Sequence, residues 1–330
     1  MQGADIPHGW LILDKPRGLG STQAVGAVKR NLREGGYPKT KVGHGGTLDP
    51  LAEGVLPIAL GEATKLAGRM LDASKVYEFT IAFGEETDTL DVEGEAIARS
   101  GHRPARDEIA AVLPQFTGEI EQTPPAYSAV KIDGRRAYDR ARAGEAVEMK
   151  VRRVTIRDLQ MGAAEGGGGG IARHSPSDGP DGPPPPPKGE ELEDVTLLAH
   201  VSKGTYIRSL ARDIARALGT VGHVTYLRRV KAGPFALEQA ISLDMLNEIG
   251  KGARLEDLLL PLEAGLDGIP AHDLDPESAQ AVRQGRVLSG MPHPDGLLLA
   301  KSGGVPVALM EVAAGTAKVV RGFNIPDTAE

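Results

Sequence analysis

The stretch Lys41-Val-Gly-His-Gly-Gly-Thr-Leu-Asp-Pro-Leu-Ala-Glu-Gly-Val-Leu-Pro-Ile-Ala-Leu-Gly-Glu-Ala-Thr-Lys65 decides how this chain is understood. Its glycines free space beside the backbone and lead to an acid, Asp49. Pro50 disfavours helical backbone at Asp49, so the carboxylate is expected on an extended or turn segment. Two interpretations follow: an ordinary surface turn, because Gly, Asp and Pro are common turn residues, or a loop that presents a reactive carboxylate.

The composition limits the class of protein. A chain of 330 residues favours two domains. It contains no cysteine, which excludes thiolate catalysis, disulfide scaffolds and Cys-ligated metal sites. Residues 1–25 lack a basic start followed by an apolar run, and apolar stretches such as Trp10 to Leu13 are too short to span a bilayer. We therefore expect a cytoplasmic protein that does not enter the membrane.

The charge is unevenly distributed along the chain. The net charge is −7, yet basic residues outnumber acidic ones in residues 15–41 and 201–233. The basic residues there are Lys15, Arg17, Lys29, Arg30, Arg33, Lys39, Lys41, Lys203, Arg208, Arg212, Arg216, Arg228, Arg229 and Lys231. Acids gather in 85–95, 190–194 and beyond 237. The pattern predicts a face that binds phosphates; dispersed, solubilising charge is the alternative.

Hydrophobic periodicity predicts alternating strands and helices over most of the chain. Strands are expected at Trp10–Leu13, Lys75–Phe83, Val151–Met161, Val195–Val201 and Val224–Phe235. Helices are expected from a cap at Ser21 or Thr22 to about Leu32, at 62–71 and at 105–113. Another is expected at about 135–143, after an Asp133-Gly134 turn. The last follows Ser202 and ends at Gly219, and its apolar stripe consists of Leu210, Ile214, Ala217 and Leu218. Residues 271–323 are predicted to form a small β-rich domain with a helix at 276–284.

A compositional break lies between two of these strands, at about 163–189. It contains five consecutive glycines, 166–170, and five consecutive prolines, 183–187. Because this segment has too few apolar residues to offset the conformational entropy lost on ordering, we predict a disordered insertion in a hairpin loop. Recruitment of a proline-binding module by the prolines is the alternative.

Several common motifs are incomplete. The loop Gly18-Leu-Gly20 follows a predicted strand but lacks the third glycine of a dinucleotide fingerprint, and no Walker phosphate loop occurs. The acidic segment 84–95 lacks the spacing of a calcium loop. The loop that carries Lys15 and Arg17 remains a candidate for binding a phosphate of a larger ligand.

Taken together, several stretches resemble the TruB family of pseudouridine synthases, bacterial enzymes that modify uridine 55 in the T loop of tRNA. These are Leu13-Asp-Lys-Pro-Arg-Gly, Gly43-His-Gly-Gly-Thr-Leu-Asp-Pro-Leu-Ala-Glu-Gly-Val-Leu-Pro, Gly61-Glu-Ala-Thr-Lys, Lys75-Val-Tyr, Gln122-Thr-Pro-Pro-Ala-Tyr-Ser-Ala-Val-Lys, Ser202-Lys-Gly-Thr-Tyr-Ile-Arg-Ser-Leu and Tyr226-Leu-Arg-Arg. The resemblance covers about residues 10–233; Gly18-Leu-Gly-Ser-Thr is one residue longer than in many members, and the insertion is outside the pattern.

The resemblance implies an α+β fold, a mixed and mainly antiparallel sheet with flanking helices and a central cleft. It also implies a catalytic domain over 1–240 and a β-rich, PUA-like RNA-binding domain over 241–330. The implied partner is the T-arm stem-loop of tRNA, and a monomer is expected. No cofactor or metal is expected, because the isomerisation oxidises nothing and releases nothing.

Individual roles also follow from the resemblance. Asp49 is expected to be the catalytic aspartate, Tyr77 to stack on the target uracil and Arg208 to pair with the aspartate. An arginine suits that pairing because its fork binds a carboxylate bidentately and stays charged. The expected RNA-binding residues are Lys15, His44, Lys65, Tyr206 and Arg229.

Two rival functions remain open. A glycosidase also places a carboxylate at an anomeric carbon but normally needs a second one, for which Glu53 is the nearest candidate in sequence. An RNA chaperone would open the tRNA elbow without chemistry.

Overall fold

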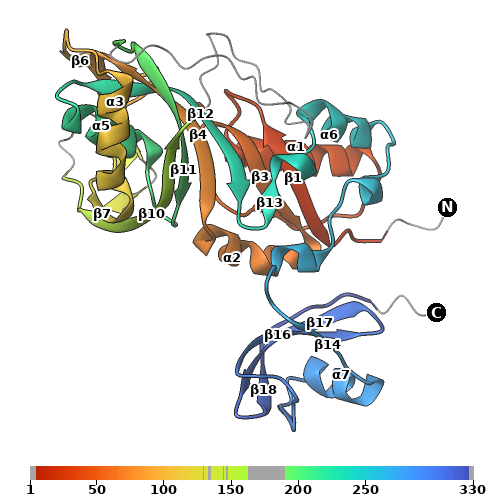
Figure 1. Cartoon of the computed structure of the whole chain (residues 1–330). Coiled ribbons are helices and arrows are strands. Elements are labelled where there is room, and N and C mark those ends of the chain that lie inside the picture. The colour runs from red at the N-terminus through yellow and green to blue at the C-terminus, as the bar shows by residue number, and fades with distance from the viewer. Residues whose placement is uncertain are drawn as a thin grey trace, which may run out of the picture. The chain divides into compact units, whose positions relative to one another are not determined.

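The structure, a computed structural model, describes residues 5–128, 130–132, 135–143, 145, 148–162 and 190–326. The chain divides into two compact units, one of Met1–Ala73 with Lys231–Glu330 and one of Ser74–Val230 (Figure 1). The predicted boundary at residue 240 falls inside the first unit, so the division into 1–240 and 241–330 stays a prediction. The predicted insertion, residues 163–189, lies outside the described residues.

Three strands organise the N-terminal part of the first unit. β3 (Glu53–Leu60) pairs antiparallel with both β1 (Gly9–Lys15) and β2 (Val42–His44). β3 is almost wholly buried, as expected for a continuous apolar run. Trp10 of β1 is fully buried; its indole Nε1 donates to the Leu262 carbonyl at 3.0 Å, and its ring centroid lies 5.2 Å from that of Phe235. The predicted strand at Trp10–Leu13 is confirmed.

The helix α1 (Ser21–Glu34) packs beside this sheet, with Ala24, Val28 and Leu32 on its buried face. Its N-cap is Gly20, so the prediction of a cap at Ser21 or Thr22 is wrong. The Gly20 amide donates instead to the Gln23 side chain at 2.7 Å, while the Ser21 hydroxyl is used elsewhere. α1 also contacts α6 (Leu243–Gly250), where Asn31 donates to the Asn247 side chain at 3.1 Å.

Residues 61–72 form two short helices where one was predicted. A 3-10 helix, η1 (Gly61–Leu66), precedes α2 (Ala67–Asp72). The Thr64 hydroxyl donates to the Gly61 carbonyl at 2.7 Å, and side-chain bonds of this kind compete with regular α-helical bonding. The remaining short elements of this unit are β13 (Phe235–Ala236), η3 (Leu237–Gln239), η4 (Leu255–Asp257) and η5 (Leu262–Gly265).

The C-terminal part of the first unit is rich in strands, as predicted, and appears in blue in Figure 1. Five strands lie in the order β14-β16-β17-β18-β15; β14 runs parallel to β16 and the other pairs are antiparallel. Their bounds are β14 Ala271–Asp273, β15 Leu288–Ser289, β16 Gly296–Ser302, β17 Val305–Ala313 and β18 Thr316–Gly322. The helix α7 (Pro276–Arg283) begins at Asp275, whose carboxylate caps the Ser278 amide, and buries Ala279 and Val282.

The second unit is built on strands in the order β12-β4-β11-β10-β7. Their bounds are β4 Lys75–Phe83, β7 Gly118–Gln122, β10 Arg152–Met161, β11 Asp194–Val201 and β12 Gly222–Ala232. The predicted antiparallel pairing of β10 with β11 is confirmed, with Met161 opposite Leu197. β11 also pairs antiparallel with β4, which places Ala199 opposite Tyr77.

The helix α5 (Ile207–Ala217) packs on β4. Leu210 and Ile214 are buried as predicted, but Ala217 is exposed, and Ala211 and Ala215 are buried in its place. The other elements of this unit are β5 (Glu85–Thr87), β6 (Ala96–Arg99), α3 (Arg106–Val112), η2 (Leu113–Phe116), β8 (Lys131–Ile132), β9 (Arg135–Arg136) and α4 (Ala137–Arg142). The predicted Asp133-Gly134 turn lies outside the described residues.

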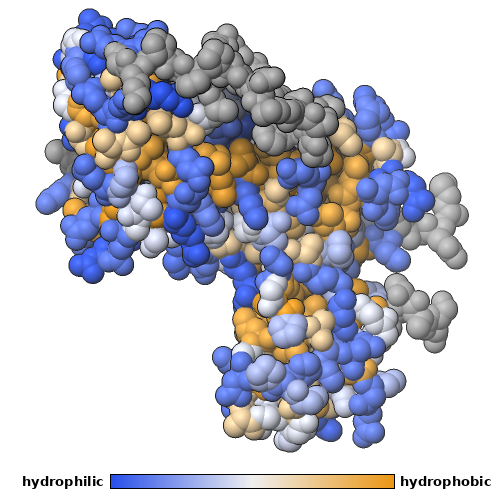
Figure 2. Space-filling model, in the orientation of Figure 1, coloured by the Kyte–Doolittle hydropathy of each residue, from blue (hydrophilic) through white to orange (hydrophobic). Residues whose placement is uncertain are grey.

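Hydrophilic residues make up much of the surface drawn in Figure 2, as expected for a chain of which 25% is charged. Within the described residues, no helix has the length and apolar character needed to cross a membrane.

Candidate active site

Asp49 lies in the loop between β2 and β3 and is half-buried. The loop is anchored at its start by a hydrogen bond from the Gly45 amide to the Pro57 carbonyl, at 2.8 Å. Gly45 is required there because a Cβ atom would lie only 2.7 Å from the Cβ of Met70. Gly46 has φ +143°, a conformation that L side chains rarely adopt. Tight packing therefore demands a glycine at position 45 and backbone geometry demands one at position 46; the predicted conformational freedom applies to Gly46, whereas the space beside Gly45 is taken by Met70.

The backbone on both sides of Asp49 is held by residues from the end of β1 and the start of α1. The Ser21 hydroxyl donates to the Leu48 carbonyl at 2.8 Å and accepts from the Leu48 amide at 2.9 Å. The Pro50 carbonyl accepts from the Gly18 amide at 2.7 Å. These contacts fix the position of the loop independently of the Asp49 side chain.

Lys15 is part of the same support. Its side chain is fully buried, and its ammonium donates to the carbonyls of Pro16, Leu19 and Pro50 at 3.0, 2.7 and 3.4 Å. A buried ammonium needs such partners, since an unpaired charge is costly to remove from water. The RNA-binding role of Lys15 stays a prediction; in this structure its ammonium contacts main-chain carbonyls.

Tyr77 belongs to the second unit and lies near the start of β4. Phe79, Ile81 and Phe83, two, four and six residues further on, are buried, whereas Tyr77 is half-buried. Side chains at this spacing share one face of a strand. This row therefore includes one aromatic residue that keeps exposed surface, which a stacking role requires.

Arg208, also in the second unit, is on the first turn of α5 and is buried. Its Nη1 donates to the Asp91 carboxylate at 3.0 Å and to the Thr89 carbonyl at 2.9 Å, and its Nη2 donates to the Tyr127 carbonyl at 3.0 Å. The Arg208 and Asp91 side chains are only 9% and 6% exposed. This is a buried, hydrogen-bonded ion pair, the kind that is costly to break from one side.

Asp91 was not predicted, although it is firmly built into the structure. Its Oδ1 accepts from the Thr89 hydroxyl at 2.6 Å and from the Glu93 amide at 3.0 Å. The neighbouring Leu90 has φ +63°, a left-handed conformation that is uncommon for a non-glycine residue. In the sequence, Asp91 is one of several acids in a turn-rich segment, so no local signal distinguishes it.

Tyr127 adds a titratable group beside this pair. A hydrogen bond to Asp88, with a smaller effect of burial, raises the pKa of the Tyr127 hydroxyl, while its carbonyl accepts from Arg208. The phenol therefore stays protonated at neutral pH.

The other predicted RNA-binding residues are distributed over both units. Lys65 forms an ion pair with Glu62 at 2.6 Å and donates to the Gly322 carbonyl at 2.9 Å. His44 is half-buried on β2, and Arg229 is 1% exposed on β12. Tyr206 precedes α5, where its backbone exchanges two hydrogen bonds with the Gln122 side chain at 2.8 and 3.1 Å. Lys65 and Arg229 are thus occupied or buried, and the RNA-binding role of all four stays a prediction.

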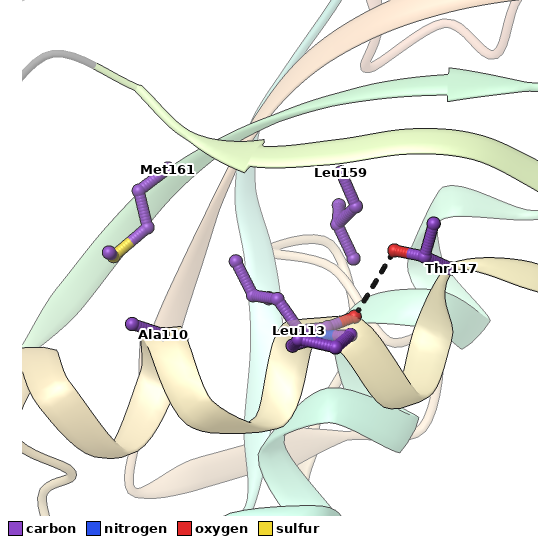
Figure 3. A pocket seen from close by; sticks show the side chains of 6 residues that line it. Ala110, Leu113, Thr117, Leu159 and Met161 are labelled. Atoms are coloured by element: carbon purple, nitrogen blue, oxygen red, sulfur yellow. Dashed lines mark hydrogen bonds between the residues drawn. The ribbon is translucent and has the colours of Figure 1, made fainter.

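A separate cavity of about 490 Å³ opens in the second unit between α3, η2 and β10 (Figure 3). It is lined by Ala110, Leu113, Pro114, Thr117, Leu159 and Met161. The Thr117 hydroxyl is directed to the Leu113 carbonyl, at 3.4 Å. None of the predicted catalytic residues lines this cavity, and its apolar walls do not suit a phosphate-bearing ligand.

Comparison with known proteins identifies the family of this chain. Residues 34–174 match the family model described as TruB family pseudouridylate synthase (N terminal domain), and residues 208–267 match tRNA pseudouridylate synthase B C-terminal domain. A Novosphingobium aromaticivorans protein named tRNA pseudouridine synthase B is 64% identical over 98% of this chain and 99% of the relative. The chain belongs to the TruB family of pseudouridine synthases. A Zymomonas mobilis protein that is also named tRNA pseudouridine synthase B is 55% identical over 97% of this chain and 97% of the relative.

Solved structures support the fold. A chain in the crystal structure of a Cbf5-Nop10-Gar1 complex aligns with a TM-score of 0.66 and 26% identity, over 96% of this chain and 84% of that one. A chain from an H/ACA RNP bound to a substrate RNA containing 2′-deoxyuridine aligns with a TM-score of 0.67 and 24% identity, over 96% and 86%. The predicted α+β fold with a β-rich C-terminal domain is therefore confirmed.

Proposed function

We propose that this TruB-family chain isomerises uridine 55 in the T loop of tRNA to pseudouridine, with Asp49 as the catalytic residue. The observation that carries the proposal is the Asp49 loop itself: a half-buried carboxylate on a backbone held at Leu48 and Pro50. The relatives that match nearly the whole chain carry the name tRNA pseudouridine synthase B, which supports the same assignment.

The reaction breaks the bond between ribose C1′ and uracil N1, turns the base and joins C1′ to C5. Asp49 either attacks C1′ or removes the C2′ proton, and both roles require the ionised carboxylate. The uracil leaves its stack to reach the pocket, where Tyr77 offers an aromatic face and a hydroxyl that moves the proton at C5. N1 gains a proton when its bond to C1′ is broken and C5 loses one when C1′ joins it, so the composition is unchanged and these steps need no oxidant or donor.

Arg208 supplies the positive charge of the proposed site. A guanidinium near a carboxylate favours the ionised form of that carboxylate. The Asp91 carboxylate and the carbonyls of Thr89 and Tyr127 hold the Arg208 guanidinium in one orientation. We propose that the charge of this guanidinium favours the ionised form of Asp49 when tRNA is bound.

We further propose that exposed basic residues on α1 and before β2 bind tRNA phosphates. We also propose that the protein acts as a monomer in the cytoplasm. Lys29, Arg30, Arg33 and Lys41 are all exposed. Unlike Lys15, these side chains reach solvent without rearrangement.

The deciding experiment maps pseudouridine by mass in tRNA treated with wild type, Asp49→Asn and Glu53→Gln. Asp49→Asn is expected to abolish the product while tRNA affinity stays within a few fold, because the side chain keeps its size and loses its charge. Glu53→Gln is the matched control, since Glu53 is the nearest second carboxylate. Product from Asp49→Asn at the wild-type rate contradicts the proposal.

The same reaction separates the rivals. A synthase releases tritium from C5-labelled uridine without releasing base, whereas a glycosidase releases free uracil and loses activity in Glu53→Gln. Wild-type protein that binds tRNA but forms neither product would be a chaperone.

A further inference from the structure

Ser21 has an unusual use of its side chain. It is the first residue of α1, yet Gly20 caps the helix and the Ser21 hydroxyl takes no part in capping. Ser21 is 5% exposed, and its hydroxyl bonds to both main-chain groups of Leu48, donating to the carbonyl at 2.8 Å and accepting from the amide at 2.9 Å. One side chain therefore provides a hydrogen-bond partner for both the amide and the carbonyl of Leu48, the residue before Asp49.

A hydroxyl is the simplest group that can do this, because it donates one hydrogen bond and accepts others. Leu48 is 4% exposed, so water does not readily replace the lost partners. An alanine at position 21 would leave a buried donor and a buried acceptor unsatisfied, and the loop would move to pair them elsewhere.

The other side of Asp49 is fixed separately. The Pro50 carbonyl accepts from the Gly18 amide at 2.7 Å, and the Ala52 amide donates to the Asp49 carbonyl at 3.1 Å. The Ser21 hydroxyl therefore holds the backbone at Leu48, while the Pro50 side keeps its own support in a Ser21 variant.

We propose that Ser21 is a positioning residue for Asp49, setting the direction from which the carboxylate meets the ribose. The inference rests on the proposed catalytic role of Asp49. Positioning matters because a shift of about 1 Å at a reacting group lowers rates by roughly 10²-fold. Ser21 is 5% exposed and its hydroxyl bonds to main-chain groups of Leu48, so loss of this hydroxyl should affect the chemical step and leave tRNA binding intact.

The test compares Ser21→Ala, Ser21→Thr and Ser21→Cys under single turnover, with tRNA affinity measured separately. Ser21→Ala is expected to lower the single-turnover rate by about 10- to 100-fold, while Kd for tRNA stays within about threefold. Ser21→Thr keeps the hydroxyl and should recover most of the rate. Ser21→Cys keeps the size with a weak donor and acceptor, and should lie between serine and alanine.

Thr22→Ala is the matched control, because it removes a hydroxyl from the next residue, which is exposed. It should react like wild type. Near-ultraviolet circular dichroism and Tm are recorded for each variant, and rates are taken well below the lowest Tm. If Ser21→Ala does not fold, the rate order of the serine, threonine and cysteine proteins still decides the question.

Three results overturn the inference: a folded Ser21→Ala with a rate within twofold of wild type, a cysteine variant as fast as the threonine variant and wild type, or a rate loss matched by an equal loss of tRNA affinity. Asp49→Asn is assayed alongside. An active Asp49→Asn would refute the proposed function itself, whereas an inactive Asp49→Asn beside a fully active Ser21→Ala refutes only the role of Ser21.

Discussion

At the scale of single residues, the chemistry of the proposed site depends on side chains whose partners are far away in sequence. Arg208 was expected to face Asp49, and the structure adds Asp91 as a buried partner at 3.0 Å. Removing one member of a buried ion pair leaves the other charge uncompensated, which typically costs about 3–5 kcal/mol.

Asp91→Ala is therefore expected to lower the stability of the protein strongly and to lower Tm by several degrees. The matched control is Glu193→Gln, which breaks the ion pair with Arg103 at 2.6 Å, where the Glu193 side chain is 78% exposed. Exposed pairs contribute about 0–1 kcal/mol, so the control should barely change Tm. Equal shifts for the two variants would show that burial of the Arg208 pair adds nothing.

At the scale of elements, the turn between β3 and η1 contains a pH-sensitive contact. The Nδ1 atom of His8 accepts a hydrogen bond from the Glu62 amide at 3.1 Å, which requires a neutral ring. Burial lowers the pKa of His8 below its ordinary value of 6.5, Glu62 opposes this, and Lys65 adds to it. Gly61 is required here, because a Cβ atom would collide with His8 Nδ1 and the Pro7 carbonyl, and φ is +55°.

The sign of the pH effect follows from this direction. Because the folded pKa of His8 lies below the unfolded value, the unfolded chain binds the proton first, and stability decreases as pH falls below about 6.5. His8→Asn keeps an acceptor near the Nδ1 position and cannot titrate. We expect the Tm of wild type to fall more than the Tm of His8→Asn when the pH is lowered from 7.5 to 5.5.

Glu62 provides the internal control. Burial raises the pKa of its carboxyl, but hydrogen bonds from Lys65 and the Asn324 amide outweigh burial, so the net pKa is lowered. The stability from this group is lost only as pH falls below its ordinary value of 4.5, outside the window used for His8. A constant difference between wild type and His8→Asn across pH 5.5–7.5 would contradict the role of His8.

Elements with a strong hydrophobic period were predictable from the sequence, and those governed by side-chain bonds were not. The alternation of Lys75–Phe83 and the paired patterns of β10 and β11 identified these strands. The helix cap at Ser21 was mispredicted because its hydroxyl bonds to Leu48, twenty-seven positions away. The carbonyl partners of Lys15 were not predictable for the same reason: a cation beside a glycine-containing loop has the same local sequence whether its partners are phosphates or carbonyls. Such pairings depend on tertiary contacts, which local pattern does not encode.

At the scale of the whole molecule, the net charge of −7 and the proposed polyanionic substrate are reconciled by where the basic side chains lie. Lys29, Arg30 and Arg33 are exposed on one helix, α1. Three other exposed basic residues lie beside carboxylates: Arg99 with Glu85 at 3.1 Å, Lys251 with Glu248 at 2.8 Å and Arg254 with Glu256 at 3.9 Å. The first group is available to phosphates, while the second is already neutralised locally.

The two groups should therefore differ in how they change the salt dependence of tRNA binding. Each phosphate contact contributes about 0.7 to 0.9 to the slope of log K against log salt. Replacing Lys29, Arg30 and Arg33 by Gln is expected to lower the magnitude of the slope by about 2 and to weaken binding at low salt. The rate at saturating tRNA should stay unchanged, because Asp49 and its support are untouched.

The matched triple variant, with Gln at Arg99, Lys251 and Arg254, removes the same charge but should leave the slope nearly at the wild-type value. Equal slopes for the two triple variants would mean that tRNA senses total charge and that α1 is not part of the binding face.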